Sequence, residues 1–508
     1  MRWTLTCVGI LGLVTAACGR SDDSSDATTA ATAAATTAAP ATTAAATDTT
    51  AAASDTTAGG AAATTTAAPA TTAAPDTSGY ALTAADIATQ CASEPLQASD
   101  VGVSADKITV EVMADTGSPL APGLFQGNID AVKAFADYIN ANGGIGCRQL
   151  EVRSWDSKID PTEAKNGLID SCANAFAMIG NNALFNPDPS PMTECVDKAG
   201  APTGLPNIAA LANDVNELCA ATTFTINPRS EQCPVNIGQP RDFSLNVGHI
   251  AYVVAQHPEG LHGLYLVPGD LPTTRQSAIP AIEAQKQLGI GFDGTPLVSG
   301  RDEQAAYTPR VQILQQKGGN YVQNGSNDVA MIRMQKESVA QGIDHDSVVW
   351  MCSVACYTGP MLEQGGDTVN GTYLAMQFLP FEEADTNAAA QAYLDSIGNG
   401  NEVSWGAQAW QAAIAFQQVV NQIVADQGPN AITRANVLNG LAGLDNFTAD
   451  GWSGAKSLRG LSPCFLLMQI QDGKFVRVYP EERGTMDCDE GNIVHVTAEP
   501  VSAADQLS

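Results

Sequence analysis

The polar residues best placed for chemistry lie directly after a hydrophobic segment near residue 110. Ile108, Val110 and Val112 alternate with polar residues, which is the period-two pattern of a β-strand entering a core. The loop at 115–123 is built largely from Gly, Ser, Pro and other small residues, and it offers backbone N–H groups and the Ser118 hydroxyl. Such groups at the carboxyl edge of a strand bind ligands through hydrogen bonds. The pattern therefore predicts recognition of a small molecule.

Motifs for catalysis are missing from the sequence. It contains no G-x-S-x-G elbow, no H-E-x-x-H zinc motif and no G-x-x-x-x-G-K-[ST] phosphate loop. The Gly-Ala-Lys-Ser run at 454–457 lacks the spacing of a phosphate loop, and the five histidines form no ligand pair at helical spacing. Asp156, Asp160 and Glu163 lie close together, but helix capping explains them better than a calcium site. We expect a protein that is not an enzyme and that uses no cofactor or metal.

The loop at 115–123 is positioned by a repeated strand–helix unit. Ile129, Val132, Ala136 and Ile139 form one apolar helical stripe directly after this loop. The alternation continues with helices at 161–175 and 192–199 and with strands at 150–155, 176–180, 207–211 and 223–226. Five strands with crossover helices form a doubly wound, parallel-sheet α/β lobe.

The pattern restarts after Asn227-Pro228-Arg229. Further elements are predicted as helices at 236–256, 273–288, 305–316, 328–341, 387–397, 404–426 and 433–441, and as strands at 263–267, 296–299, 321–323, 348–351 and 372–377, with a hairpin at 464–479. We therefore expect two doubly wound lobes joined by a hinge of crossing strands. The predicted boundaries are 80–227 and 372–450 for lobe 1, and 228–371 and 451–508 for lobe 2. A cleft between such lobes can enclose a small molecule.

The N-terminus resembles a bacterial lipoprotein signal. Arg2 and the apolar run at 5–17 precede Cys18, which would become the lipidated first residue after removal of residues 1–17. An ordinary signal peptide with a chance cysteine at its end is the alternative. Residues 18–79 are almost entirely Ala, Thr, Pro, Ser and Asp, so we expect a disordered tether. Acyl chains on Cys18 would hold the protein at a membrane without a spanning segment.

Charge and cysteine content narrow the class of protein. A net charge of −30, from 24 Lys and Arg against 54 Asp and Glu, argues against nucleic acid and against a polybasic membrane patch. An even set of cysteines in an exported chain favours disulfides. Apart from Cys7 and Cys18 they are Cys91, Cys147, Cys172, Cys195, Cys219, Cys233, Cys352, Cys356, Cys464 and Cys488.

The sequence does not determine how these cysteines pair. Pairing each with its sequence neighbour gives five sensible loops, and Cys464 with Cys488 brackets the predicted hairpin. Cys352 and Cys356 are close enough for a tight local bridge or for a metal site. No histidine lies near them and the expected compartment is oxidising, so the bridge is favoured.

Several segments together resemble a known family. They are ITVEVMADTGSPLAPGLFQGNIDAVKAFADYINANGGIG, LEVRSWDSKIDPTEA, FAMIGNN, GLPNIAAL, TFTINP, GLYLVPGD, SWGAQAWQAAIAFQQVV and PCFLLMQIQDGKFVRV. In this order they are similar to the type I periplasmic binding proteins, specifically to the leucine/isoleucine/valine-binding branch of ABC-transporter solute-binding proteins. The resemblance covers about residues 105–480, and the lipoprotein start fits a binding protein anchored on the outer face of the cytoplasmic membrane.

The resemblance implies a ligand site in the strand-end loops that face the cleft. The residues at the matching positions are Thr116, Gly117, Ser118, Asn181, Asn182, Ala183, Leu211, Asn213, Asn227, Asp270, Asn324, Cys356 and Tyr357. The family usually offers Ser or Thr hydroxyls where this chain has amides at 181–182. Amino-acid-binding members also place an acid in the last loop or at the hinge to pair with the ligand ammonium, and this chain has none there. A buried ammonium without such a partner is costly.

Structural roles are the alternative for several of these residues. Ser118 can cap the following helix, and Asn181 and Asn182 can occupy turn positions that favour asparagine. Tyr357 can be a core aromatic residue, and Asp270 can be a surface loop acid.

The resemblance implies an extracytoplasmic, lipid-anchored protein that captures a small molecule, such as an amino acid or amide, and delivers it to an ABC importer. Its expected partners are the ligand, the permease and, through lipid alone, the membrane. The alternative is a surface protein that senses a ligand and signals to a membrane partner without transport. A third possibility, an adhesive or structural surface protein, would show no ligand-dependent shift in melting temperature.

Overall fold

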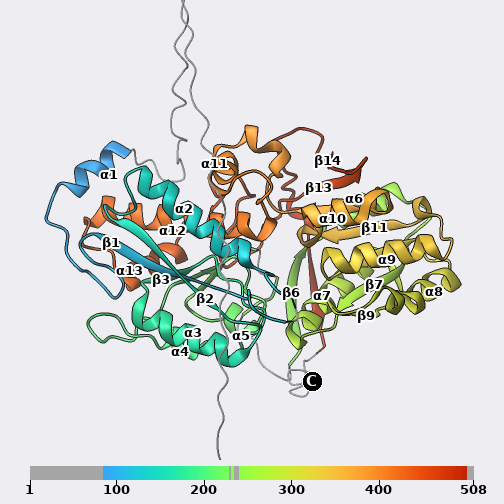
Figure 1. The fold of residues 1–508 in the computed structure, drawn as a ribbon, viewed down its shortest axis with the longest axis horizontal. Helices are drawn as coiled ribbons and strands as arrows, with labels where there is room; N and C mark the ends of the chain where they lie inside the picture. Colours follow the sequence, from blue (N-terminus) through green and yellow to red (C-terminus); the bar gives the residue numbers. More distant parts are fainter. Residues whose placement is uncertain (1–83, 120, 228–229, 234–238, 500–508) are drawn as a thin grey trace, which may run out of the picture. The chain divides into compact units, whose positions relative to one another are not determined.

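The computed structural model describes residues 84–499 with gaps at 120, 228–229 and 234–238 (Figure 1). All of them fall within one compact unit of the chain. The predicted signal peptide at 1–17, the predicted lipidation at Cys18 and the predicted tether at 18–79 lie outside the described residues.

The first sheet has five parallel strands in the order β2-β1-β3-β4-β5, as the sequence predicts. They are β1 (Lys107–Ala114), β2 (Gln149–Asp156), β3 (Ala177–Ile179), β4 (Asn207–Ala209) and β5 (Thr223–Thr225). Helix α1 (Ala84–Cys91) precedes these strands. The helices between them are α2 (Gln126–Ala141), α3 (Pro161–Asn174), α4 (Ser190–Thr193) and α5 (Val215–Leu218). The carboxyl ends of these strands carry the loops at 115–125, 180–189 and 210–214.

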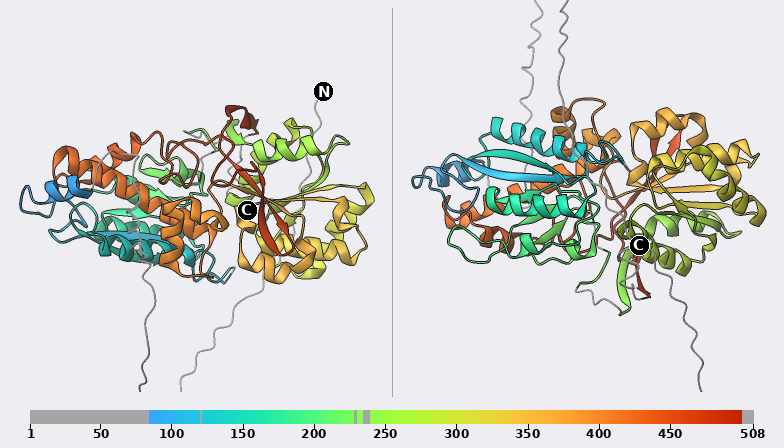
Figure 2. Two further views of the ribbon diagram at one scale, coloured as in Figure 1. Left: turned by 90° about the horizontal axis from the view of Figure 1, so that it is seen from above. Right: turned by 60° about the horizontal axis from the view of Figure 1, so that its bottom comes forward.

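Three helices from late in the chain complete this first lobe: α11 (Ala388–Ile397), α12 (Ser404–Gln427) and α13 (Arg434–Ala442). Helix α12 packs along α2, and the two run side by side in both views (Figures 1 and 2). Trp410 of α12 is buried, and its ring meets Phe135, Tyr138 and Tyr393 at centroid distances of 5.0, 5.8 and 5.6 Å. Apolar burial therefore ties the returning chain to the first lobe.

The second sheet has the order β14-β13-β12-β11-β10-β7-β8, with β9 also paired to β7. Its strands are β7 (His262–Pro268), β8 (Gly291–Gly294), β9 (Leu297–Val298), β10 (Tyr321–Asn324), β11 (Val349–Ser353), β12 (Tyr373–Met376), β13 (Leu466–Gln471) and β14 (Lys474–Tyr479). Strand β13 pairs antiparallel with both β12 and β14, and the remaining pairs of this sheet are parallel. The associated helices are α6 (Gly248–Gln256), α7 (Pro272–Gln287), α8 (Thr308–Lys317), α9 (Asp328–Ala340) and α10 (Gly359–Gly365).

Two predictions about boundaries are wrong. The segment 372–450 was assigned whole to lobe 1, but β12 pairs with β11 and so belongs to the second sheet. The helix predicted from residue 236 begins only at Gly248, because β6 (Arg241–Asn246) forms a two-stranded antiparallel sheet with β15 (Ile493–Ala498). Local periodicity could not reveal that pairing, since its partner strand comes about 250 residues later in the chain.

The ten cysteines form the five neighbour pairs. They are Cys91–Cys147, Cys172–Cys195, Cys219–Cys233, Cys352–Cys356 and Cys464–Cys488. The prediction of a bridge between Cys352 and Cys356 is thus confirmed. In the described part of the chain, no group of three His, Cys, Asp or Glu side chains is arranged to hold a metal ion. No helix within the same ranges has the length and hydropathy needed to cross a bilayer.

Candidate functional site

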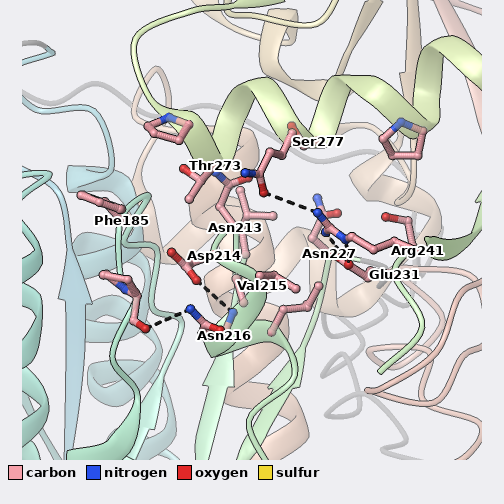
Figure 3. A pocket seen from close by; sticks show the side chains of 18 of the residues that line it. Phe185, Asn213, Asp214, Val215, Asn216, Asn227, Glu231, Arg241, Thr273 and Ser277 are labelled. Carbon is pink, nitrogen blue, oxygen red and sulfur yellow. Dashed lines mark hydrogen bonds and ion pairs between the residues drawn. The ribbon is translucent and has the colours of Figure 1, made fainter. Parts of the chain in front are cut away.

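A pocket of about 290 Å³ collects residues from both lobes and from the chain that joins them. The first lobe contributes the loop after β3, the loop after β4 and helix α5, while the second contributes β6 and the start of α7. Figure 3 shows Asn213 and Asp214 on one side of the space and Thr273 and Ser277 of α7 on another. The full lining is Phe185, Pro187, Leu211, Ala212, Asn213, Asp214, Val215, Asn216, Leu218, Asn227, Ser230, Glu231, Arg241, Phe243, Pro272, Thr273, Gln276, Ser277 and Pro280.

Asp214 is positioned by the start of helix α5. Its carboxylate caps the helix by accepting from the Asn216 N–H at 2.9 Å, which fixes the side chain against the backbone. Asp214 is only 3% exposed, and burial raises the pKa of its carboxyl above the ordinary value. The neighbouring Asn213 Nδ2 is buried without a hydrogen-bond partner. A ligand in the pocket therefore meets an acid and a free amide donor side by side.

Helix α7 presents its first turns to the pocket. Pro272 occupies the first turn of the helix, a position where its missing N–H costs nothing. The Thr273 hydroxyl donates to the Leu184 carbonyl in the loop after β3 at 3.0 Å, and the Ser277 hydroxyl donates to the Thr274 carbonyl at 2.8 Å. The first of these bonds links the two lobes directly across the pocket.

The pocket holds one buried ion pair. Arg241 of β6 and Glu231 are 8% and 6% exposed at their side chains and are bonded through both the Nε and Nη2 atoms of the guanidinium. The Arg241 guanidinium also lies 5.2 Å from the centroid of the Phe243 ring, and its Nη1 donates to Gln276 Oε1 at 3.5 Å. The positive charge of Arg241 is therefore already compensated (Figure 3).

Three of the residues predicted for the site line this pocket: Leu211, Asn213 and Asn227. Asn227 also donates to Gln408 Oε1 of α12 at 3.3 Å, so it joins the hinge to the first lobe. Leu211 and Asn213 lie in the loop after β4, which is where the family resemblance placed a wall of the cleft. Their contact with a ligand remains a prediction.

The predicted residues in the first two loops make structural contacts outside the pocket. The N–H groups of Thr116 and Gly117 both donate to Asp156 Oδ1 at 3.0 Å, and Ser118 is buried. Asn181 accepts from the Met113 N–H at 2.7 Å and donates to Asn207 Oδ1 at 2.8 Å, so it ties three strands together. Asn182 and Ala183 are also buried.

The predicted residues in the second lobe also hold their own loops. Asp270 is exposed and accepts from the Ser299 hydroxyl at 2.5 Å and the Gly300 N–H at 2.8 Å. Asn324 donates to the Asn327 carbonyl at 2.7 Å and accepts from the Ser326 N–H.

The last predicted loop of the second lobe is likewise packed internally. Cys356 is closed in its bridge to Cys352, and the Tyr357 hydroxyl donates to Glu382 at 2.5 Å. None of the four predicted residues of this lobe lines the pocket, and their part in binding stays a prediction.

Sequence reasoning missed the charged and aromatic side chains of the pocket, which include Phe185, Asp214, Glu231 and Arg241. Asp214 follows Leu211–Asn213 directly and stands three residues before Glu217, so a helix-capping signal was present in the sequence. Arg241 carried no such signal, because it reaches the pocket only through the pairing of β6 with β15.

Two α/β lobes of parallel strands, crossed by more than one segment and lined by polar groups where they meet, define a hinged solute-binding fold. A family model described as periplasmic binding protein matches residues 107–474. The chain belongs to that family, and the type I assignment predicted from the sequence is confirmed. The family consists of extracytoplasmic solute-binding proteins, which are not enzymes.

Solved structures of the same fold include three ABC-transporter or leucine-binding proteins. A substrate-binding protein of an ABC transporter from Aeropyrum pernix is 12% identical with a TM-score of 0.57, covering 79% of this chain and 98% of that one. A fatty acid ABC transporter substrate-binding protein from Thermomonospora curvata is 14% identical with a TM-score of 0.56, covering 76% and 97%. A leucine-binding protein from Thermotoga maritima is 12% identical with a TM-score of 0.54, covering 73% and 97%. A search of curated protein sequences gave no match.

Proposed function

We propose that this protein is an extracytoplasmic solute-binding lipoprotein that captures a small molecule between its lobes and delivers it to an ABC importer. The pocket shared by the two lobes is the observation that carries this proposal. Its lining combines apolar walls with a few fixed polar groups, which is the usual composition of a small-molecule site. At about 290 Å³ the pocket suits a ligand of amino-acid size rather than a large one.

The Thr273–Leu184 hydrogen bond supports a mechanism of closure. Because Leu184 and Thr273 belong to different lobes, a ligand that touches both sides adds contacts only when the lobes are together. Closure then requires only that these contacts favour the closed arrangement over the open one. The permease would recognise that arrangement.

A thermal-shift screen of the full chain tests capture. A solute present at a hundredfold excess over its dissociation constant adds about 2.7 kcal/mol to stability, so amino acids, amides, amines and short carboxylates are compared by melting temperature. Asn213→Ala should weaken the binding of any solute that stabilises the protein. Asn174→Ala, which removes an exposed asparagine on α3, is the matched control. A panel in which no solute shifts the melting temperature would refute capture.

The lipid anchor is tested separately. Cys18→Ala in the full chain should release the protein from the membrane fraction into the medium, because acylation needs the Cys18 thiol. Retention of the Cys18→Ala protein in the membrane fraction would contradict the anchor but leave solute capture standing.

A further inference from the structure

The charges around the pocket do not balance. Among the described residues that line it, Asp214 and Glu231 are acids and Arg241 is the one base. Arg241 is bonded to Glu231, so these two charges compensate each other. Within the described ranges, Asp214 forms no ion pair, and its carboxylate accepts a hydrogen bond from the Asn216 N–H. Among the described lining residues, one buried negative charge is therefore left without a cation.

The hydrogen-bonding side chains that line the pocket also favour a ligand that donates hydrogen bonds. The hydroxyl protons of Thr273 and Ser277 are donated to backbone carbonyls, so these side chains present oxygen lone pairs to the pocket. Asn227 donates its amide to Gln408, which leaves its own oxygen as an acceptor. Asn213 Nδ2 is a neutral amide donor that has no hydrogen-bond partner among the described residues. A lining that combines these acceptors with the Asp214 carboxylate favours a ligand rich in N–H groups.

Apolar surfaces line the rest of the pocket. Phe185, Leu211, Val215 and Leu218 come from the first lobe, and Phe243 and Pro280 come from the second. These groups suit a small hydrocarbon body and give no hydrogen bonds to a second charged group. The ligand must therefore carry its charge at one end.

We propose that the ligand is a small protonated organic amine without a carboxylate group, and that Asp214 pairs with its ammonium group. This inference rests on the proposed function and specifies its substrate class. A ligand carboxylate would approach Asp214 and Glu231, while the only base among the described lining residues is already occupied. Like charges brought together without water are strongly unfavourable.

Four probes that share one hydrocarbon skeleton separate the possible charge states. Isopentylamine carries the cation, isocaproate the anion, leucine both and isocaproamide neither. Isothermal titration of the full chain at pH 7 should give isopentylamine the lowest dissociation constant, at least about tenfold below those of leucine and isocaproate. Asn213 Nδ2 can donate a hydrogen bond to the carbonyl oxygen of isocaproamide, which should bind with intermediate affinity.

Asp214→Asn removes the charge but keeps a good helix cap, since asparagine caps as well as aspartate. It should weaken isopentylamine binding at least about 30-fold and leave isocaproamide binding unchanged. The matched control is Asp160→Asn, which changes the exposed acid that caps α3 and is absent from the pocket lining. This control should bind both probes as the native chain does.

A measurement on the native chain covers the case in which Asp214→Asn fails to fold. Affinity for isopentylamine should fall as pH decreases, because protonation of Asp214 removes its charge, and affinity for isocaproamide should stay constant. Tighter binding of leucine or isocaproate than of isopentylamine would overturn the amine assignment but support solute capture. Absence of binding by all four probes would also overturn the amine assignment, and the wider thermal-shift panel would then decide capture on its own.

Discussion

At the scale of single residues, the loop after β4 and the short helix α5 contain a second acid whose state is unusual. Glu217 is 1% exposed, and its Oε1 accepts from Asn207 Nδ2 at 3.1 Å. Its Oε2 has no hydrogen-bond partner. Burial raises the pKa of its carboxyl to about 8, with smaller contributions from the nearby Asp214 and Asp115 carboxylates. Glu217 is therefore mostly protonated at neutral pH and acts as a neutral hydrogen-bonding group.

Glu217→Gln tests this protonation state. Between about pH 4.5, where the group titrates in the unfolded chain, and about pH 8, the folded protein binds the proton and the unfolded chain does not. The contribution of Glu217 to stability is thus fully present below pH 4.5 and is lost by about 1.4 kcal/mol per pH unit as pH rises towards 8. Glutamine carries no proton to lose, so the variant should gain stability over the native chain as pH increases.

The measurement compares urea denaturation of both proteins at pH 5 and pH 8. The stability difference between Glu217→Gln and the native chain should be more favourable to the variant at pH 8 by more than about 2 kcal/mol. Glu194→Gln, at an exposed site, should show no such difference. If the free energy of unfolding changed equally with pH in all three proteins, Glu217 would be ionised in the native state.

At this scale the sequence predicted the loops better than the side chains. Leu211 and Asn213 line the pocket because they follow a strand at the carboxyl edge of a parallel sheet, while their contact with a ligand stays a prediction. Asn181 was grouped with them on the same evidence, but its amide bonds to Met113 and Asn207 inside the sheet. Asn213 and Asn181 both follow a short strand in a loop of small polar residues, so their local sequence patterns are the same. Only the three-dimensional packing decides whether an asparagine turns towards the pocket or towards the strands.

At the scale of secondary-structure elements, helix α12 is the part of the returning chain that holds the first lobe together. It spans 24 residues, and its Trp410 inserts against Phe135 and Tyr138 of α2. Trp410→Ala should destabilise the protein by about 3–5 kcal/mol, because it removes a fully buried aromatic side chain and leaves a cavity. Trp405→Ala, on the same helix but only partly buried, should cost less. Equal losses would show that burial at position 410 is not the cause.

The disulfides make a second prediction at this scale. Cys91–Cys147 closes a loop of 56 residues, whereas Cys352–Cys356 closes one of 4. Chain-entropy arguments give about 4 kcal/mol for the first and about 2 kcal/mol for the second. The paired Cys→Ser variants should therefore differ in chemical denaturation, with the Cys91/Cys147 variant the less stable. The reverse order would mean that burial of the Cys352–Cys356 bridge outweighs the loop entropy.

Most strands of both sheets were predictable as elements because each buried strand carries a short apolar run bounded by polar turns, but β8, which reads Gly291-Phe292-Asp293-Gly294, has no such run and was not predicted. The separate β6–β15 pair was also not predicted, and β6 reads Arg241-Asp242-Phe243-Ser244-Leu245-Asn246, which alternates like a strand but stands at the start of an apolar helical segment. Its identity depends on β15, and no local signal links the two.

At the scale of the whole molecule, the two lobes are expected to move about their connecting segments, and one hydrogen bond makes this testable. Thr273→Val keeps the shape of the side chain but removes the donor to the Leu184 carbonyl in the other lobe. The free protein should then favour the open arrangement by about 0.5–1.5 kcal/mol, which increases its mean radius of gyration in X-ray scattering. Saturating ligand should return the variant to the radius of the liganded native chain.

Thr274→Val is the matched control for this change in mean radius. The Thr274 hydroxyl donates within its own lobe, to the carbonyls of Leu271 and Pro268, so its removal should leave the radius of the free protein unchanged. An identical increase in the radius of gyration of both variants would indicate local loosening of α7. No increase in Thr273→Val, together with a ligand-independent radius in the native chain, would mean that the lobes do not move on binding and that the pocket is a fixed site.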